Sequence, residues 1–503
     1  MKPTALLLLG LLAAATKTAT SLANSTSLAS CLSDAIVPFI TPSSDDWPLL
    51  STSFNTRLPY TPLTIVIPRS TSHIIGAVRC GVAAGVKVTP KAGGHSYAAL
   101  GLGGEDGHMV VEMEHMTAVS LDPETGIATV QPGARLGDIA IEIFRKGARA
   151  FSHGTCLGVG IAGHALHGGY GMSSREHGLA LDWVDGLTVV LANGTAVDCS
   201  ASEHPDLFFA MLGAGSGFGI ASELRFRTFA APETVTWFSA TLPWNRTTAM
   251  AGLEALETYT RGVMPKELNM RLTGSAYSMS LEGVYYGDRA GLDDALAPLL
   301  EKTGGEVVTA GTTGWIGGLE HYSETGMGLN VLYPYDAHDE FYSKSLELQG
   351  LNGTSAQNFV DYGFDVAPTI NRMWWFQLDL QGGSSSGIWA RNDGVTSYAH
   401  RDKLYIIQFY DRVISGKYPT DGFEFLDGWV NATTAPLEWG TWGMYVNYAD
   451  ARLERGEAEE LYWGVNLPRL QEIKAEVDPG EVFYNPVSIE PAKEQKLGGG
   501  CGC

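Results

Sequence analysis

The chain has 503 residues, of which 45% are hydrophobic, and its formal net charge at pH 7 is −22. This length leaves room for two or three domains. The strong negative charge repels polyanions, so the composition argues against nucleic acid or an anionic membrane as a partner. The 61 glycines exceed the usual share of about 7%, which is typical of a fold with many turns and close backbone contacts.

The first 23 residues have the features of a signal peptide. Lys2 precedes an apolar run from Ala5 to Ala15, and small residues follow through Ala23. The run is too short for a membrane span, and no later segment reaches the ~20 apolar residues that a spanning helix needs. We therefore expect a secreted, extracellular glycoprotein. Its five N-x-S/T sequons are at Asn24, Asn193, Asn245, Asn352 and Asn431.

Six cysteines occur along the chain. In an oxidising compartment Cys31 and Cys80 form a plausible disulfide, whereas Cys199 follows a strand-like run and is expected to be a buried free thiol. Cys501 and Cys503 end a glycine-rich tail. The chain contains no CxxC or Cys/His zinc spacing, so we expect no metal site.

Residues 59–229 alternate short strands with helices. Strands are predicted at 63–67, 86–88, 109–113, 127–130 and 187–191, and helices at 72–85 and 136–144. The last strand turns at Asn193-Gly194, a dipeptide typical of hairpins. Because no G-x-G-x-x-G follows the first strand and opens a helix, this region is not a Rossmann unit.

Residues 230–440 are rich in aromatic side chains and predict an antiparallel sheet flanked by helices. Strands are predicted at 374–380 and 405–410, and a helix at 247–259. The segment 441–490 contains a helix at 467–476, and we expect it to pack back on the first domain. Residues 491–503 are predicted to form a disordered tail. The fold class is therefore α+β with two principal domains.

Two glycine-rich loops each contain one nucleophilic side chain. His95 lies in K-A-G-G-H-S-Y (residues 91–97), and Cys156 lies in G-T-C-L-G-V-G-I-A-G-H (residues 154–164). Glycine lets backbone approach a ligand closely, and stacked N–H groups in such loops bind anions such as pyrophosphate. The pattern suggests a cofactor that the loop backbone binds and that a side chain bonds covalently. Taken alone, glycine-rich loops favour a different interpretation: two turn-rich surface loops with an incidental histidine and a buried cysteine.

Further motifs weigh against the incidental interpretation. They are H-G-G-Y-G (167–171), G-L-A-L-D (178–182), G-A-G-S-G-F-G-I (213–220), Y-V-N-Y-A-D (445–450) and D-P-G-E-V-F-Y-N-P (478–486). In this order the motifs resemble the flavin-dependent oxidases of the vanillyl-alcohol-oxidase superfamily, and more narrowly the berberine-bridge-like branch. S-H-G-T-C (152–156) and W-x-Q-x-D (375–379) are most similar to fungal oligosaccharide oxidases such as glucooligosaccharide and chitooligosaccharide oxidases. The resemblance covers nearly all of the mature chain. It implies an FAD-binding domain (59–229), a substrate-binding domain (230–440) and a C-terminal berberine-bridge-like segment (441–490).

The resemblance implies FAD attached twice, through His95 Nδ1 to the flavin 8α carbon and through the Cys156 sulfur to C6. These bonds need an uncharged imidazole and a thiolate. The bond to His95 is the stronger expectation, because the cysteine loop could also hold a flavin that is tethered once. The other positions expected to bind the cofactor are Lys91, Ala92, Gly93, Gly94, Ser96, Thr155, Gly160, Gly163, Gly168, Gly169, Asp182, Gly219 and Ile220.

On the substrate side, the resemblance implies Tyr448 as the catalytic base and Asp379 as its supporting carboxylate. A carboxylate alone raises the pKa of a nearby phenol, so Asp379 is expected to act as a hydrogen-bond acceptor or proton relay. Tyr445 is the alternative candidate for the catalytic base. On an extended strand their odd spacing places them on opposite faces, and only one would then face the flavin. The positions matching a sugar site are Tyr97, Trp375, Gln377 and Gln408, and Val159 matches an oxygen-access position.

The expected activity is oxidation of the C1 hydroxyl of an oligosaccharide reducing end to a lactone, with O2 reduced to H2O2. One alternative is an oxidase or dehydrogenase of the same fold that acts on an alcohol or secondary metabolite through a narrower, more apolar site. Another is a secreted flavoprotein without enzymatic activity, which the presence of Tyr448 and both tether residues disfavours. The partners expected are an oligosaccharide and O2, and the glycosylated, acidic chain is expected to be a monomer.

Overall fold

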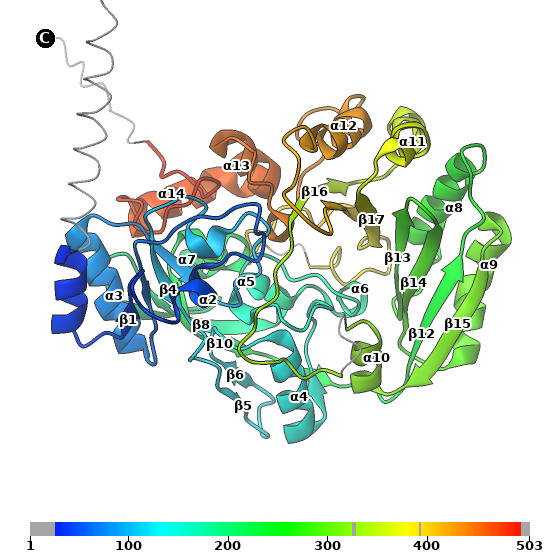
Figure 1. Ribbon diagram of the computed structural model, residues 1–503. Helices are drawn as coiled ribbons and strands as arrows, with labels where there is room; N and C mark the ends of the chain where they lie inside the picture. Colours follow the sequence, from blue (N-terminus) through cyan, green and yellow to red (C-terminus); the bar gives the residue numbers. More distant parts are fainter. Residues whose placement is uncertain (1–25, 324–327, 392–393, 494–503) are drawn as a thin grey trace, which may run out of the picture.

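The computed structural model describes residues 26–323, 328–391 and 394–493. The predicted signal peptide, Asn24 and most of the predicted tail, with Cys501 and Cys503, lie outside the described residues. Two domains lie side by side, the first with smaller sheets and the second with one large sheet (Figure 1). Within the described ranges, no helix has the length and apolar character needed to cross a membrane.

The first domain begins with a four-stranded sheet in the order β1 (Phe39–Ile40), β2 (Thr64–Val66), β4 (Met109–Glu112) and β3 (Val88–Lys91). Helix α3 (Thr71–Ala84) begins where Ser70 accepts a hydrogen bond from the His73 amide, and it ends at Gly85 in the left-handed region. A disulfide joins Cys31 to Cys80 on α3, as predicted. The residues before Pro59 therefore also belong to this domain.

The second sheet of the first domain is antiparallel and has the order β5 (Val119–Leu121), β6 (Ala128–Val130), β10 (Ile220–Phe226), β8 (Val184–Val190) and β9 (Ala196–Cys199). The predicted hairpin joins β8 to β9, with Gly194 at φ 71°. Cys199 is a buried free thiol, as predicted, and burial raises its pKa to about 12. Helix α4 (Leu136–Gly147) follows β6. The short helix α5 (Ile161–Ala165) begins within the second glycine-rich segment, and the short helix α6 (Ser174–His177) follows it. α7 (Pro205–Ala214) lies between β9 and β10, and β7 (Arg149–Ala150) pairs with β11 (Phe229–Ala230).

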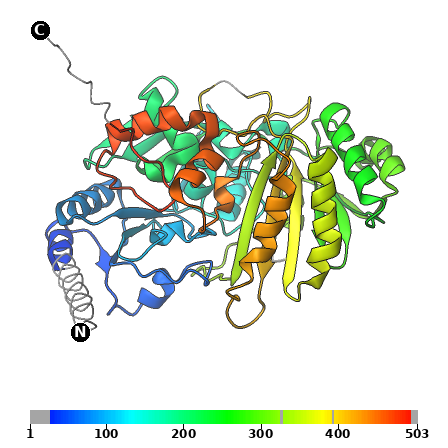
Figure 2. The ribbon, with the colours of Figure 1, turned by 90° about the horizontal axis from the view of Figure 1, so that it is seen from above.

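The second domain is built on a seven-stranded antiparallel sheet, which confirms the predicted α+β class. Its strand order is β15 (Glu306–Thr313), β12 (Val235–Thr241), β14 (Met279–Tyr285), β13 (Leu268–Ser275), β17 (Met373–Leu380), β18 (Tyr405–Arg412) and β16 (Phe341–Leu348). One face is covered by α8 (Ala249–Gly262), α9 (Arg289–Thr303), α11 (Gly353–Asp361) and α12 (Phe423–Thr434) (Figures 1 and 2). The other face turns toward the first domain.

The C-terminal segment packs against the first domain. Its helices α13 (Arg455–Trp463) and α14 (Leu467–Val477) lie over that domain in Figure 2. The buried Lys474 donates to the Gly217 carbonyl and pairs with Asp478 at 2.6 Å. Beyond α14, the Val482 carbonyl accepts a hydrogen bond of 2.8 Å from the amide of Val88 at the start of β3. The segment therefore holds residues 445–450 against the glycine-rich loops.

Candidate active site

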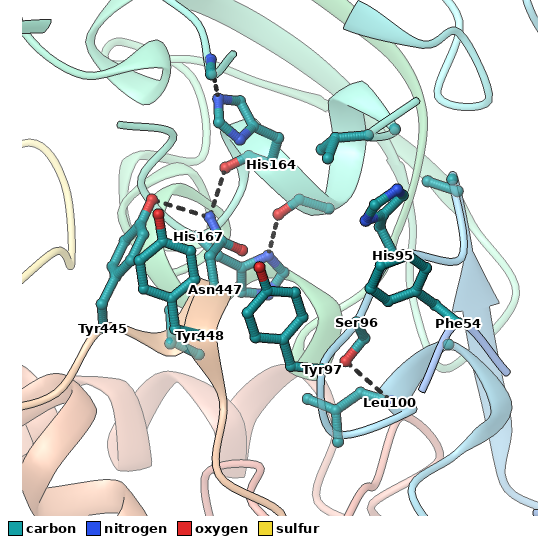
Figure 3. Close-up of a pocket in the computed structure, with 18 of the residues that line it drawn as sticks. Phe54, His95, Ser96, Tyr97, Leu100, His164, His167, Tyr445, Asn447 and Tyr448 are labelled. Carbon is teal, nitrogen blue, oxygen red and sulfur yellow. Dashed lines mark hydrogen bonds between the residues drawn. The ribbon is translucent and has the colours of Figure 1, made fainter. Parts of the chain in front are cut away.

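A cavity of about 650 Å³ separates the glycine-rich loops from the open face of the large sheet. Figure 3 shows His95, Ser96 and Tyr97 on one side, with Tyr445, Asn447 and Tyr448 across from them. The predicted site residues that line the cavity are Lys91, Ala92, Gly93, Gly94, His95, Ser96, Tyr97, Thr155, Cys156, Val159, Gly160, Gly163, Trp375, Gln377, Gln408 and Tyr448. The fold thus gathers residues from five separate stretches of the chain, at 91–97, 155–163, 375–377, 408 and 448.

The two glycine-rich loops touch through their backbones. A Cβ atom on Gly160 would lie 2.2 Å from the amide nitrogen of Gly93, so only glycine permits this approach. Arg135, at the start of α4, donates from Nη1 to the Gly93 carbonyl at 2.9 Å and to the Gly158 carbonyl. Arg135 was missed by the sequence analysis, because it lies outside both motifs and the contact depends on tertiary structure.

His95 and Cys156 meet at one end of the cavity. Nε2 of His95 lies 3.8 Å from Cys156 Sγ and 2.6 Å from the hydroxyl of Tyr335. Burial and then the Arg135 cation lower the pKa of His95 to about 3. The imidazole is therefore neutral at ordinary pH, which is the form a nucleophilic nitrogen requires.

A row of four aromatic rings runs from this end toward Tyr448. The ring centroids are 4.1 Å apart for His95 and Phe54, 6.2 Å for Phe54 and Tyr97, and 5.6 Å for Tyr97 and Tyr448, each pair being stacked. Figure 3 shows Tyr97 between the His95 and Phe54 rings on one side of the cavity and the Tyr448 ring on the other. Packed aromatic side chains of this kind hold one another in position, so both ends of the row are fixed relative to each other.

Tyr445 and Tyr448 both line the cavity, so the expectation that they lie on opposite faces was wrong. They lie at the start and end of a 3₁₀ turn (Val446–Tyr448) rather than on an extended strand. Residues three apart on such a turn point in the same direction, and the two rings meet edge to face at 5.1 Å. The Tyr445 hydroxyl accepts hydrogen bonds from the amides of Gly169 and Tyr170 at 2.8 and 3.1 Å. Tyr445 is thereby tied to backbone.

Tyr448 lies within the electrostatic influence of a buried ion pair. Burial raises the pKa of Tyr448 well above 10; the charge of Asp379 raises it further and the charge of Arg271 lowers it. Arg271 on β13 and Asp379 on β17 are register partners, with Nε and Oδ1 3.1 Å apart. Arg271 lines the cavity, whereas Asp379 does not. The Asp379 carboxylate is therefore paired with Arg271 but is not itself part of the cavity lining.

The substrate-side residues come from alternate positions of β17 and β18. Gln408 donates to the Tyr97 hydroxyl at 2.9 Å, and Gln377 accepts from Arg271 at 3.1 Å. Trp375 stacks on Tyr410 at 4.2 Å. Arg271 and Tyr410 were missed by the sequence analysis because only the strand register brings them beside Gln377 and Trp375.

Five predicted cofactor positions do not line this cavity: Gly168, Gly169, Asp182, Gly219 and Ile220. Asp182 is instead buried in a salt bridge with Arg401 at 2.6 Å, and it caps the Leu179 amide. Ile220 is in the core, and a Cβ on Gly219 would crowd Val189. Ser216 and Gly217 line the cavity in their place.

The chemistry and shape of the cavity fit FAD. Gly163 lines the cavity and is exposed, and a Cβ atom there would meet no atom within 4 Å. The open space at this glycine is where a ligand would contact backbone. A neutral imidazole and a thiol lie at one end, and backbone-rich loops line the rest. Within the ranges that the structure describes, no group of three or more His, Cys, Asp or Glu residues is arranged to hold a metal ion.

Two family models match the sequence. The model described as an FAD binding domain matches residues 62–200, and the model described as "berberine and berberine like" matches residues 444–490. Xylooligosaccharide oxidase from Thermothelomyces thermophilus is 48% identical over 469 residues, covering 92% of this chain and 94% of the relative. The chain belongs to the berberine-like family of FAD-linked oxidases.

Other members of this family are similarly close. Chitooligosaccharide oxidase from Gibberella zeae is 44% identical, with 92% of this chain and 94% of the relative covered. A structure of xylooligosaccharide oxidase from Myceliophthora thermophila in complex with xylobiose is 47% identical and has a TM-score of 0.91, with 93% of this chain and 100% of that chain covered. Glucooligosaccharide oxidase from Acremonium strictum, which has 6-S-cysteinyl, 8α-N1-histidyl FAD, is 44% identical and has a TM-score of 0.90, with 93% and 99% covered.

Proposed function

We propose that this berberine-like oxidase converts the C1 hydroxyl of an oligosaccharide reducing end to a lactone and reduces O2 to H2O2. We further propose that its FAD is bonded to His95 and Cys156. The observation that carries the proposal is that the Tyr448 phenol shares one cavity with both nucleophiles and with the glutamines of the large sheet. Relatives at 44–48% identity that act on xylo- and chitooligosaccharides support the substrate class.

Different residues around the cavity bind the sugar and transfer its proton. Gln377 and Gln408 offer donors and acceptors to sugar hydroxyls, and the ring of Trp375 offers an apolar face to a pyranose. Tyr448 takes the proton of the C1 hydroxyl, and Arg271 stabilises the phenolate that forms. FAD, when bound, supplies the acceptor for the hydride from C1.

Several features support secretion, glycosylation and a monomeric state as parts of the same proposal. The disulfide between Cys31 and Cys80 suits an oxidising compartment. The sequon residues Asn193, Asn245, Asn352 and Asn431 are all exposed. Surface glycans and a net charge of −22 oppose close self-association.

The test is a peroxide assay across xylo-, gluco- and chitooligosaccharides, with small alcohols as controls. We expect H2O2 release with at least one sugar series and the matching lactone as product. Turnover of an alcohol without turnover of any sugar would replace the proposal with the alternative of an alcohol or metabolite oxidase. Polar side chains on the substrate side, such as Gln377 and Arg271, disfavour that alternative.

A further inference from the structure

A loop of the second domain crosses onto the first domain. This crossing loop, residues 328–340, leads from α10 (Trp315–His321) to β16 and runs beside the first domain in Figure 1. Leu329 packs with Ala140 and Leu157 of the first domain. The Tyr333 hydroxyl donates to the Asp138 carboxylate at 2.5 Å. The loop is therefore anchored to α4 at two points and to the second glycine loop at one.

Tyr335 is the residue of the crossing loop that reaches the cofactor nucleophiles. Its hydroxyl lies 2.6 Å from His95 Nε2, and its ring lies 4.0 Å from the guanidinium carbon of Arg135. A Cβ on Gly158 would lie 2.2 Å from this ring, so a glycine is required for the ring to fit. Since Arg135 also binds the carbonyls of Gly93 and Gly158, ring and loops form one packed unit.

The contact between Tyr335 and His95 is compatible with the imidazole tautomer that attachment requires. For Nδ1 to be the nucleophile it must carry the lone pair, and the proton of the neutral ring must then be on Nε2. In that tautomer Nε2–H donates to the Tyr335 hydroxyl oxygen. Phe54, stacked at 4.1 Å, holds the ring plane on its other side.

We propose that Tyr335, held by Arg135, is the positioning residue for flavin attachment at His95, and that its hydroxyl relays the proton that Nε2 loses: the oxygen accepts the Nε2 proton as the phenolic proton passes to solvent, so the phenol stays neutral. This inference rests on the proposed bond between His95 and the flavin. An imidazole bonded at Nδ1 remains neutral only when Nε2 gives up its proton, and the Tyr335 oxygen, 2.6 Å from Nε2, is a nearer acceptor than Cys156 Sγ at 3.8 Å. Arg135 has only donors, so it does not replace Tyr335 in this step.

Attachment of the flavin to His95 is a two-electron oxidation at the flavin 8α carbon. Nδ1 forms a bond to the flavin 8α carbon, and one C–H bond of that carbon breaks. The carbon is oxidised by two electrons, which reduce the flavin ring. Two protons accompany them, one from the 8α carbon and one from Nε2 through Tyr335. Molecular oxygen, the acceptor in the proposed activity, then takes the two electrons and two protons and leaves as H2O2.

The test measures attachment rather than sugar oxidation. Full-length Cys156→Ala protein, in which only His95 can be bonded, is produced under riboflavin limitation and then incubated with FAD and O2. Flavin fluorescence of the denatured protein on a gel and the mass of the His95 peptide follow the reaction. Tyr335→Phe should slow attachment by about 100-fold, the scale of a lost proton-transfer group. Tyr333→Phe is the comparison variant, since it removes one anchor of the same loop but keeps the Tyr335 hydroxyl, and it should slow attachment much less than Tyr335→Phe.

A small added base separates proton uptake from packing. Imidazole or acetate buffer at rising concentration should restore attachment in Tyr335→Phe and leave the parent rate unchanged. Equal rates for Tyr335→Phe and the parent would overturn the inference, and so would a slow variant that no added base accelerates. If the Cys156→Ala protein carries no flavin on His95, both this inference and the proposed bond between His95 and the flavin are overturned. If flavin is attached to His95 but no sugar is oxidised, only the proposed substrate is overturned.

Discussion

The two walls of the cavity are built on different principles. On the first domain the wall is largely backbone: Gly93 and Gly160 touch, and Arg135 clamps their loops together. On the second domain the wall is made of side chains from strands far apart in the chain, such as Arg271 and Gln377. A backbone wall depends on a few glycines in a contiguous motif. A side-chain wall depends on register and on the balance of buried charges.

This difference predicts different responses to substitution. A change on the backbone wall should abolish the shape that holds the cofactor, whereas a change on the side-chain wall should leave the cofactor in place and alter chemistry. Tyr448 is the exception that joins both regions, because its turn comes from the C-terminal segment that packs on the first domain. Among variants that keep the cofactor in place, the largest effect on turnover is therefore expected at Tyr448.

Tyr448→Phe should reduce kcat by about 100- to 10,000-fold, since it removes the proposed general base while keeping the ring that stacks on Tyr97. Stopped-flow reduction of the flavin by sugar measures the effect directly. Tyr445→Phe is the control from the same turn. It should reduce kcat much less and should lower Tm, because two backbone amides lose their acceptor. The reverse order of kcat losses would assign the base to Tyr445.

Two glycines of the backbone wall should respond in different ways to the same added methyl group. Gly160→Ala places a Cβ against the Gly93 backbone and should prevent both loop closure and FAD uptake. Gly163→Ala places its Cβ in open cavity space, so the apoprotein should keep its Tm while its affinity for FAD falls at least about tenfold, the effect of a clash of about 1.4 kcal/mol. FAD titration of the apoprotein and thermal melts distinguish the two. Unchanged FAD affinity in Gly163→Ala would show that the cofactor does not use this face.

On the side-chain wall, Asp379→Asn and Arg271→Met should shift the pH profile of kcat in opposite directions. The charge of Asp379 raises the pKa of Tyr448 and that of Arg271 lowers it. Loss of the carboxylate should therefore move the rising limb of kcat to lower pH, and loss of the guanidinium should move it to higher pH, each by about one unit or more. Shifts in the same direction would contradict the electrostatic account.

The same variants test how the buried pair contributes to stability. Either single substitution leaves one buried charge without its partner and should reduce the free energy of unfolding by about 3–5 kcal/mol. The double variant should lose less than the sum of the singles, because neither charge is then left unpaired. Urea unfolding of all four proteins measures the coupling. Additive losses would mean that the two side chains act independently.

The contrast between the walls also explains what the sequence could predict. The glycine loops, His95 and Cys156 could be predicted because each motif is contiguous and glycine has few other reasons to recur so densely. Strands 374–380 and 405–410 were recognised from their pattern, but the place of Arg271 beside Asp379 depends on β13 pairing with β17, more than 100 residues later. The turn at Tyr448 was mistaken for a strand because aromatic residues favour strands, whereas tertiary contacts set its 3₁₀ geometry.

The smallest effect on the site is expected from the disulfide, which lies in the first domain and lines neither wall. Cys31→Ala with Cys80→Ala opens a loop with a sequence separation of 49 residues, which should cost about 4 kcal/mol in the chain-entropy model. Thermal melts with and without reductant measure this loss. Since the cavity walls keep their own contacts, kcat at 25 °C and the fraction of covalently attached flavin should equal those of the parent. A fall in either would mean that the glycine loops depend on the outer sheet for their shape.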